Sequence, residues 1–129
     1  MPYKNLSPNF AVKDVNKTVD FYTNVLGFNC IMTVPEEGQF VWAMVQADGL
    51  TIMFQEQKNL TDEYPQLEKY SIGGTLTFYI NVTDIQKHYD NLKDKATIAK
   101  DLHTTFYGAI DFAIEDCNGY ILTFSQSAD

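Results

Sequence analysis

The feature that most constrains the fold of this chain is an internal repeat with a fixed offset of 70 residues. The residues that coincide at this offset include alternating apolar positions, turn glycines and an aspartate that precedes a helical pattern. The identical pairs are Leu6 and Leu76, Val12 and Val82, Asp14 and Asp84, Lys17 and Lys87, Asp20 and Asp90, Gly38 and Gly108, Ala43 and Ala113, Gly49 and Gly119, and Phe54 and Phe124. Because one register holds along both halves, we interpret the chain as two copies of one module.

Each copy has the pattern of a strand, a helix and three further strands. Residues 6–12 and 76–82 are apolar and β-branched, which is typical of strands, and Asp14 and Asp84 then suit helix N-caps. Further strands are expected at residues 28–34, 39–47 and 50–56, and again at 98–100, 109–115 and 120–126. A two-residue turn is expected at Asp48-Gly49 and a four-residue turn at residues 116–119. The predicted fold class is α+β, with two tandem β-α-β-β-β modules.

The two modules are joined by a polar segment. We place module one at about residues 4–56, the linker at 57–74 and module two at about 75–127, within one domain spanning residues 1–129. The linker contains Pro65 and the pair Gly73-Gly74, and a short helix is expected around residues 66–70. Because a long linker between similar modules permits exchange between subunits, we expect a homodimer.

Composition excludes several classes of partner. The chain has 129 residues and a formal net charge of −8, so its field repels a phosphate backbone and nucleic acid is not an expected partner. No apolar run approaches the roughly 18 residues of a membrane span, and residues 1–10 lack a signal-peptide core. The two cysteines, Cys30 and Cys117, form neither a metal-binding pair nor a disulfide framework. We therefore expect a cytoplasmic protein.

Two segments carry a resemblance to a known family. Tandem modules of this order with KDVNKTVDFYTNVLGFNC early and FAIEDCNGYILTFSQ late resemble the vicinal oxygen chelate superfamily, which includes glyoxalases, bleomycin-resistance proteins and extradiol dioxygenases. The resemblance implies that the sheet of each module curls and that paired modules form a cupped cavity. It also implies that catalytic members hold a divalent metal there through four side chains, typically His, Gln or Glu.

The positions that this resemblance assigns to the metal are occupied by unsuitable residues. They are Ser7, Met53, Thr77 and Thr123, two pairs that share the offset of 70. Hydroxyls and a thioether do not supply the anionic or imidazole ligands that such sites use. We therefore expect no metal and no other cofactor. If the ligands are displaced instead, the candidates are Glu56, Glu115 and His103.

Strand alternation predicts which side chains line the cavity. The two-residue turn places Met44 opposite Met53 and Trp42 opposite Gln55, and the four-residue turn turns Phe112 and Ile114 inward. Trp42 and Phe112 are equivalent in the repeat and could clamp a planar or cationic group; alternatively, both rings only fill the core. The predicted ligand-binding residues are Ser7, Asn9, Trp42, Met44, Met53, Gln55, Thr77, Tyr79, Phe112, Thr123 and Ser125.

This lining is apolar and aromatic with neutral hydrogen-bonding groups, which is typical of a pocket for an organic ligand. The sequence therefore favours a metal-free small-molecule binding protein, similar to the bleomycin-resistance branch, that acts by sequestration rather than catalysis. The acidic surface favours a cationic ligand. Two alternatives remain: a metal-dependent glyoxalase- or dioxygenase-like enzyme with displaced ligands, and a metal-independent isomerase or lyase that uses a carboxylate or a tyrosine such as Tyr79 or Tyr107.

Overall fold

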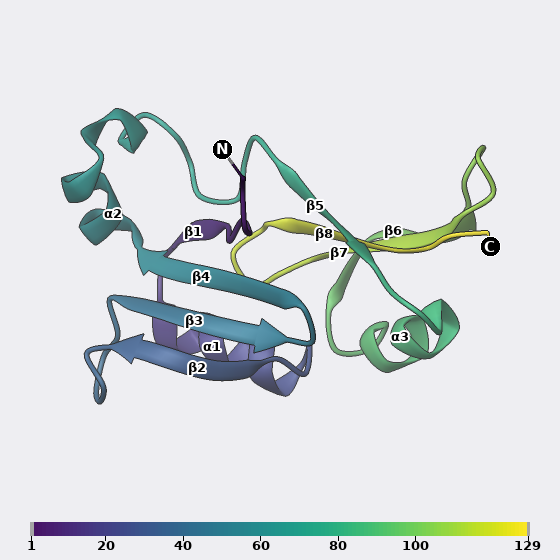
Figure 1. The fold of residues 1–129 in the computed structure, drawn as a ribbon, viewed down its shortest axis with the longest axis horizontal. Helices are drawn as coiled ribbons and strands as arrows, with labels where there is room; N and C mark the ends of the chain where they lie inside the picture. The colour runs from purple at the N-terminus through teal and green to yellow at the C-terminus, as the bar shows by residue number, and fades with distance from the viewer. Residues whose placement is uncertain (1, 129) are drawn as a thin grey trace. The chain divides into compact units, whose positions relative to one another are not determined.

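The computed structural model describes residues 2–128 and divides the chain into two compact units, the first ending at Ile72 and the second beginning at Gly73. Each unit contains one four-stranded mixed sheet with a helix between its first and second strands (Figure 1). This confirms the predicted α+β class with two β-α-β-β-β modules. Among the described residues, no helix is long and apolar enough to cross a membrane.

Unit 1 comprises β1 (Asn9–Val12), α1 (Val15–Asn24), β2 (Asn29–Val34), β3 (Trp42–Ala47) and β4 (Leu50–Glu56), followed by α2 (Gln57–Glu63) and a 3-10 turn at Pro65–Leu67. Its strands lie in the order β1-β4-β3-β2, with β1 parallel to β4 and the remaining pairs antiparallel. Unit 2 repeats this with β5 (Thr77–Asn81), α3 (Ile85–Leu92), β6 (Thr97–Thr104), β7 (Ile110–Glu115) and β8 (Ile121–Gln126), in the order β5-β8-β7-β6. Here too the first and last strands run parallel.

Two elements differ from the sequence prediction. The short strand expected at residues 98–100 is the eight-residue β6, which includes His103, a residue expected in a loop. The first part of the expected linker is the helix α2, while the segment around residues 66–70 contributes only a 3-10 turn. Helix α2 begins where it does because the carboxylate of Glu56 accepts hydrogen bonds from the backbone N–H groups of Lys58 and Asn59. Leu60 anchors the helix by its burial.

The two aspartates expected to cap helices behave differently. Asp14 has extended backbone angles and its side chain accepts a hydrogen bond from the backbone N–H of Lys17, as predicted. Asp84 precedes α3 with left-handed angles, φ 57° and ψ 50°, and its side chain makes no capping bond. The Gln126 side chain performs this role instead, because its Oε1 accepts a hydrogen bond of 2.8 Å from the Ile85 N–H.

One face of each sheet is buried under its helix. In unit 1 the ring of Tyr22 on α1 lies 4.7 Å from Phe54 and meets Phe10 edge to face, and all three residues are buried. In unit 2 α3 packs against β7 and β8. There Tyr89 meets Phe112 edge to face with ring centroids 5.3 Å apart. Because side chains alternate along a strand, this packing assigns every other residue to the opposite face of the sheet.

The hairpin between β7 and β8 has a different register from the predicted one. In unit 1, Ala47 pairs with Leu50 across the expected two-residue turn. In unit 2 the last ladder pair is Glu115 with Ile121, and the backbone N–H of Asp116 bonds to the Tyr120 carbonyl at 2.9 Å. The turn therefore spans Cys117–Gly119, one residue more than in unit 1. It is also one residue shorter than the predicted four-residue turn, which inverts β7 relative to the prediction, so Phe112 and Ile114 face the helix.

The capping difference leads to a test by substitution. Asp14→Ala is expected to lower the free energy of unfolding by about 1 kcal/mol, because a capping bond is lost. Asp84→Gly is the matched control and should change it by less than about 0.5 kcal/mol, since glycine adopts the left-handed conformation without strain. Urea denaturation followed by circular dichroism measures both. Equal losses in the two variants would contradict the assignment of the caps.

The effect of Asp14 should also depend on pH. Its capping bond with the Lys17 N–H holds the pKa of Asp14 below the ordinary value of 3.8. A carboxyl group whose pKa is lowered by folding stabilises the folded state above its unfolded pKa, and this contribution is lost as the pH falls through the folded pKa. The difference between wild type and Asp14→Ala should therefore be full at pH 7 and shrink below about pH 3.8.

Candidate functional site

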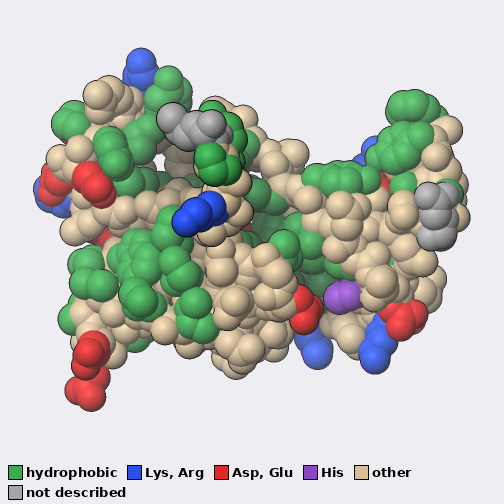
Figure 2. Space-filling view, viewed as in Figure 1, with side chains coloured by type: hydrophobic (Ala, Val, Ile, Leu, Met, Phe, Trp, Pro, Cys, Tyr) green, Lys and Arg blue, Asp and Glu red, His purple; other side chains and the backbone are tan. Residues whose placement is uncertain are grey.

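The sheet of unit 1 carries an apolar surface on the side opposite α1, here called the unit 1 face (Figure 1). In the space-filling view, hydrophobic side chains gather over β2, β3 and β4 on this side (Figure 2). The register and burial pattern assign to this face Asn9, Ala11, Met32, Val34, Trp42, Met44, Thr51, Met53 and Gln55. The predicted pairings of Met44 with Met53 and of Trp42 with Gln55 are confirmed.

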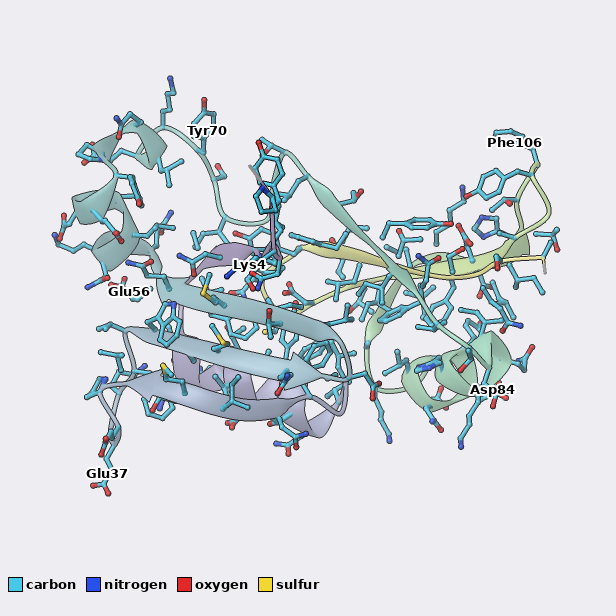
Figure 3. The ribbon with its side chains drawn as sticks, in the orientation of Figure 1. Lys4, Glu37, Glu56, Tyr70, Asp84 and Phe106 are labelled. Carbon is cyan, nitrogen blue, oxygen red and sulfur yellow. The ribbon has the colours of Figure 1, made fainter. Side chains whose placement is uncertain are left out.

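Three methionines form a row across this face. Met32 on β2 pairs with Met44 on β3, which pairs with Met53 on β4, and Asn9 on β1 continues the row. The side-chain view shows sulfur atoms over β2, β3 and β4 on the side toward the viewer (Figure 3). The neighbouring row consists of Val34, Trp42, Gln55 and Ala11. Trp42 therefore lies beside the methionine row, between Val34 on β2 and Gln55 on β4.

Met32 and Val34 were not predicted for this site. Both are exposed, with relative exposures of 56% and 48%. The segment that forms β2 is apolar without a clear alternation. The residues alone therefore do not show which of its side chains face the helix and which face the opposite side of the sheet. A register irregularity between Cys30 and Met32 shifts the pairing of β2 with β3, and as a result Met32 and Val34 lie on the unit 1 face.

Hydrogen-bonded side chains border the apolar rows. Asn9 donates to Gln55 Oε1 at 2.8 Å, and Gln55 Nε2 donates to Asn59 Oδ1 at 2.7 Å and Glu63 Oε1 at 3.0 Å. Both N–H donors of Gln55 are therefore taken within the protein, and the side chain ties β1 and β4 to α2. The hydroxyls of Ser7 and Thr51 are also joined, at 2.5 Å.

The sheet of unit 2 presents a more polar surface on the side opposite α3, here called the unit 2 face. Its register assigns to this face Thr77, Tyr79, Asn81, Thr97, Lys100, His103, Asp111, Ala113, Glu115, Ile121, Thr123 and Ser125. Four of the predicted residues are therefore brought together here, namely Thr77, Tyr79, Thr123 and Ser125. The prediction for Phe112 was wrong: its side chain is completely buried against Phe124 and Tyr89 under the helix.

A tyrosine network lies on the unit 2 face. The hydroxyl of Tyr79 donates to Ser125 Oγ at 2.7 Å and lies 3.4 Å from the hydroxyl of Tyr107. The contact with Tyr79 raises the pKa of Tyr107 above its ordinary value, and the negative charge of Asp111 raises it further. Both effects keep the Tyr107 hydroxyl protonated, which argues against this residue as a general base near neutral pH.

Asp111 is the residue of the unit 2 face that sequence reasoning missed. It pairs with Ser125 on one side and His103 on the other, and only 5% of its surface is exposed. Its Oδ1 is the one buried side-chain nitrogen or oxygen atom in residues 2–128 without a hydrogen-bond partner. The predicted four-residue turn at residues 116–119 is one residue too long and would place Asp111 on the helix side. The observed three-residue turn places it on the unit 2 face.

Comparison with known protein families and structures identifies the class of protein to which this fold belongs. The model of the glyoxalase/bleomycin resistance protein/dioxygenase superfamily matches residues 7–124, and the chain belongs to this superfamily. An uncharacterized protein of Bacillus subtilis strain 168, YurT, is 29% identical over 109 residues, which are 81% of this chain and 84% of YurT.

Solved structures show the same fold at low identity. TioX from Micromonospora sp. ML1 aligns with a TM-score of 0.75 and 20% identity, covering 96% of this chain and 98% of TioX. TnmS3 from Streptomyces sp. CB03234, described as an antibiotic binding protein, aligns with a TM-score of 0.76 and 16% identity, covering 98% of each chain. At these identities the likeness concerns the fold.

The residues at the superfamily's metal positions do not fit a divalent metal. Ser7 bonds to Thr51, Met53 lies in the methionine row, and Thr77 and Thr123 lie on the unit 2 face. None supplies an imidazole or a carboxylate. Among the displaced candidates, both oxygens of Glu56 are already bonded to backbone N–H groups of α2. Within residues 2–128, no cluster of three or more His, Cys, Asp or Glu side chains is placed to hold a metal ion.

This misfit predicts the response of the protein to metals. Addition of Zn²⁺, Ni²⁺, Mn²⁺ or Fe²⁺ should leave the melting temperature of the purified protein unchanged, because a ligand that binds the native state must stabilise it. Elemental analysis should find no stoichiometric metal. A stoichiometric metal whose removal lowers the melting temperature would contradict the assignment. Loss of that metal in Glu115→Gln or His103→Ala would then identify the displaced ligands.

Proposed function

We propose that the chain binds a small organic molecule and acts by sequestering it, without a metal. The observation that carries this proposal is the unit 1 face, where Trp42 lies beside the row of Met32, Met44 and Met53. On this sheet face Met32 is exposed and Trp42, Met44 and Met53 are half-buried. Such a face, without the superfamily's metal ligands, is suited to holding an apolar ring system and lacks the groups for metal-assisted chemistry.

The side chains of this face suit a planar aromatic ligand. Tryptophan offers a large rigid surface for stacking, and such contacts contribute about 0.5–1.5 kcal/mol beyond the buried area. Methionine side chains are flexible and polarizable, so a row of them adapts to ligand shape and makes favourable contacts with aromatic rings. Amide groups at the border, such as Asn9, supply hydrogen bonds that orient a ligand.

The charge of the chain favours cationic ligands. Its formal net charge of −8 attracts cations and raises their local concentration at low ionic strength. The description of TnmS3 as an antibiotic binding protein supports a binding role on this fold. We therefore propose a planar organic cation as the ligand class. Homodimer formation and a cytoplasmic location remain predictions from the sequence.

The single tryptophan provides a direct test of this proposal. Trp42 is the only tryptophan of the chain, so its fluorescence reports on the unit 1 face alone. Bleomycin and doxorubicin, both aromatic cations, should quench it in a saturable, one-to-one manner and should be recovered unchanged. The anionic dye 8-anilinonaphthalene-1-sulfonate should bind more weakly, and added salt should reduce this difference.

Substitutions refine the same test by calorimetry. Trp42→Ala should weaken binding of the aromatic cation by about tenfold, which corresponds to the loss of one stacking contact, whereas Trp42→Phe should retain most of the affinity. Phe106→Ala is the matched control, because Phe106 is a completely exposed aromatic residue at the tip of the β6–β7 loop (Figure 3). Binding that is insensitive to Trp42→Ala, or turnover of the ligand, would overturn the proposal.

A further inference from the structure

One oxygen of the buried Asp111 carboxylate has no hydrogen-bond partner among residues 2–128. The residue is 95% buried, and its Oδ1 accepts no hydrogen bond from the residues that the structure describes. A carboxylate oxygen removed from water without a compensating hydrogen bond destabilises the folded state. Such an atom in a folded protein therefore calls for an explanation.

The basic side chains on the same face do not pair with this carboxylate. His103 lies directly opposite Asp111, but its Nδ1 is 2.8 Å from the Asp101 carbonyl oxygen, to which it donates. Lys100 lies opposite Ala113, farther along β6, and its side chain is exposed. Among the described residues, neither forms an ion pair with Asp111. The Asp111 carboxylate therefore has no ion-pair partner in the part of the chain that the structure describes.

Two tyrosines lie next to the carboxylate. The hydroxyl of Tyr79 is bonded to Ser125, and Ser125 is the register partner of Asp111 on β8. Tyr107 lies within 3.4 Å of the Tyr79 hydroxyl, and the Asp111 charge contributes to its raised pKa. The two tyrosines are 54% and 55% exposed, so they can rotate without disturbing the sheet.

We propose that Asp111, Tyr79 and Tyr107 form a binding site for the protonated amine of an organic ligand. This inference goes beyond the proposed function, because the site lies on the unit 2 face alone and does not involve Trp42 of unit 1. The ammonium group donates a hydrogen bond to Asp111 Oδ1 and lies against the tyrosine rings, whose negative faces attract cations. A divalent metal is disfavoured here, because one carboxylate with neutral hydroxyls supplies too few anionic oxygens.

A small probe separates this site from the rest of the protein. Benzylammonium should shift the amide resonances of Asp111 and Ser125 in a saturable manner in nuclear magnetic resonance spectra, whereas benzyl alcohol, its neutral counterpart, should not. Asp111→Asn should weaken the binding of benzylammonium by about tenfold or more, as expected for a charged hydrogen bond. Glu115→Gln is the matched control, because it removes the same charge from the same face of β7 and should leave binding intact.

The stability of Asp111→Asn is a readout that needs no ligand. If Asp111 serves binding rather than folding, removing its buried charge should raise the melting temperature of the protein, since the unpaired carboxylate is destabilising. A lower melting temperature would show that Asp111 has a stabilising partner and would overturn the proposal. Binding of benzylammonium that persists in Asp111→Asn, or equal binding of benzyl alcohol, would also overturn it.

Discussion

The arrangement of this protein depends on one constraint, the alternation of side chains across a sheet that has a helix on one side only. In unit 1 Tyr22 packs against Phe10 and Phe54, and alternate residues of each strand therefore face the core. The residues between them face the other side of the sheet and form the candidate binding surface, whether they are apolar or polar. The identity of the site residues therefore follows from strand register, and a difference of one residue in a turn exchanges core and surface.

This constraint explains which parts of the site could be predicted from the sequence. The repeat predicted both modules, and Asp48-Gly49 defines a two-residue turn, so the pairing of Met44 with Met53 followed from the residues. In unit 2 the Asp116 side chain accepts hydrogen bonds from Asn118 and Tyr120 and closes a three-residue turn. The residues 116–119 alone do not reveal this geometry, and Phe112 was therefore placed on the wrong face. The cap of α3 was equally hidden, since Gln126 lies far from Ile85 in the sequence.

The two faces have diverged in chemistry although they share a fold. Unit 1 presents methionines and a tryptophan, while unit 2 presents hydroxyls, a histidine and a buried carboxylate. The superfamily's metal positions follow the same division, with Met53 in the apolar row and Thr77 and Thr123 among the hydroxyls. A face with neutral groups at these positions has no ligands for a Lewis acid, and under the proposed function it serves as a surface on which an organic molecule is held.

A comparison of two buried aspartates in unit 2 gives the strongest support for Asp111 as a binding residue. Asp111 and Asp116 are 5% and 6% exposed and lie within one hairpin. The Oδ1 atom of Asp116 accepts backbone hydrogen bonds of 2.8 and 2.9 Å, which closes the turn and accounts for a buried carboxylate at that position. No such bond reaches Asp111 Oδ1 from the described residues. Because burial is nearly equal, desolvation disfavours both charges similarly, yet within residues 2–128 the Oδ1 atom of Asp116 is compensated by hydrogen bonds and that of Asp111 is not. A role in folding explains Asp116, whereas Asp111 is explained by a donor that arrives from outside.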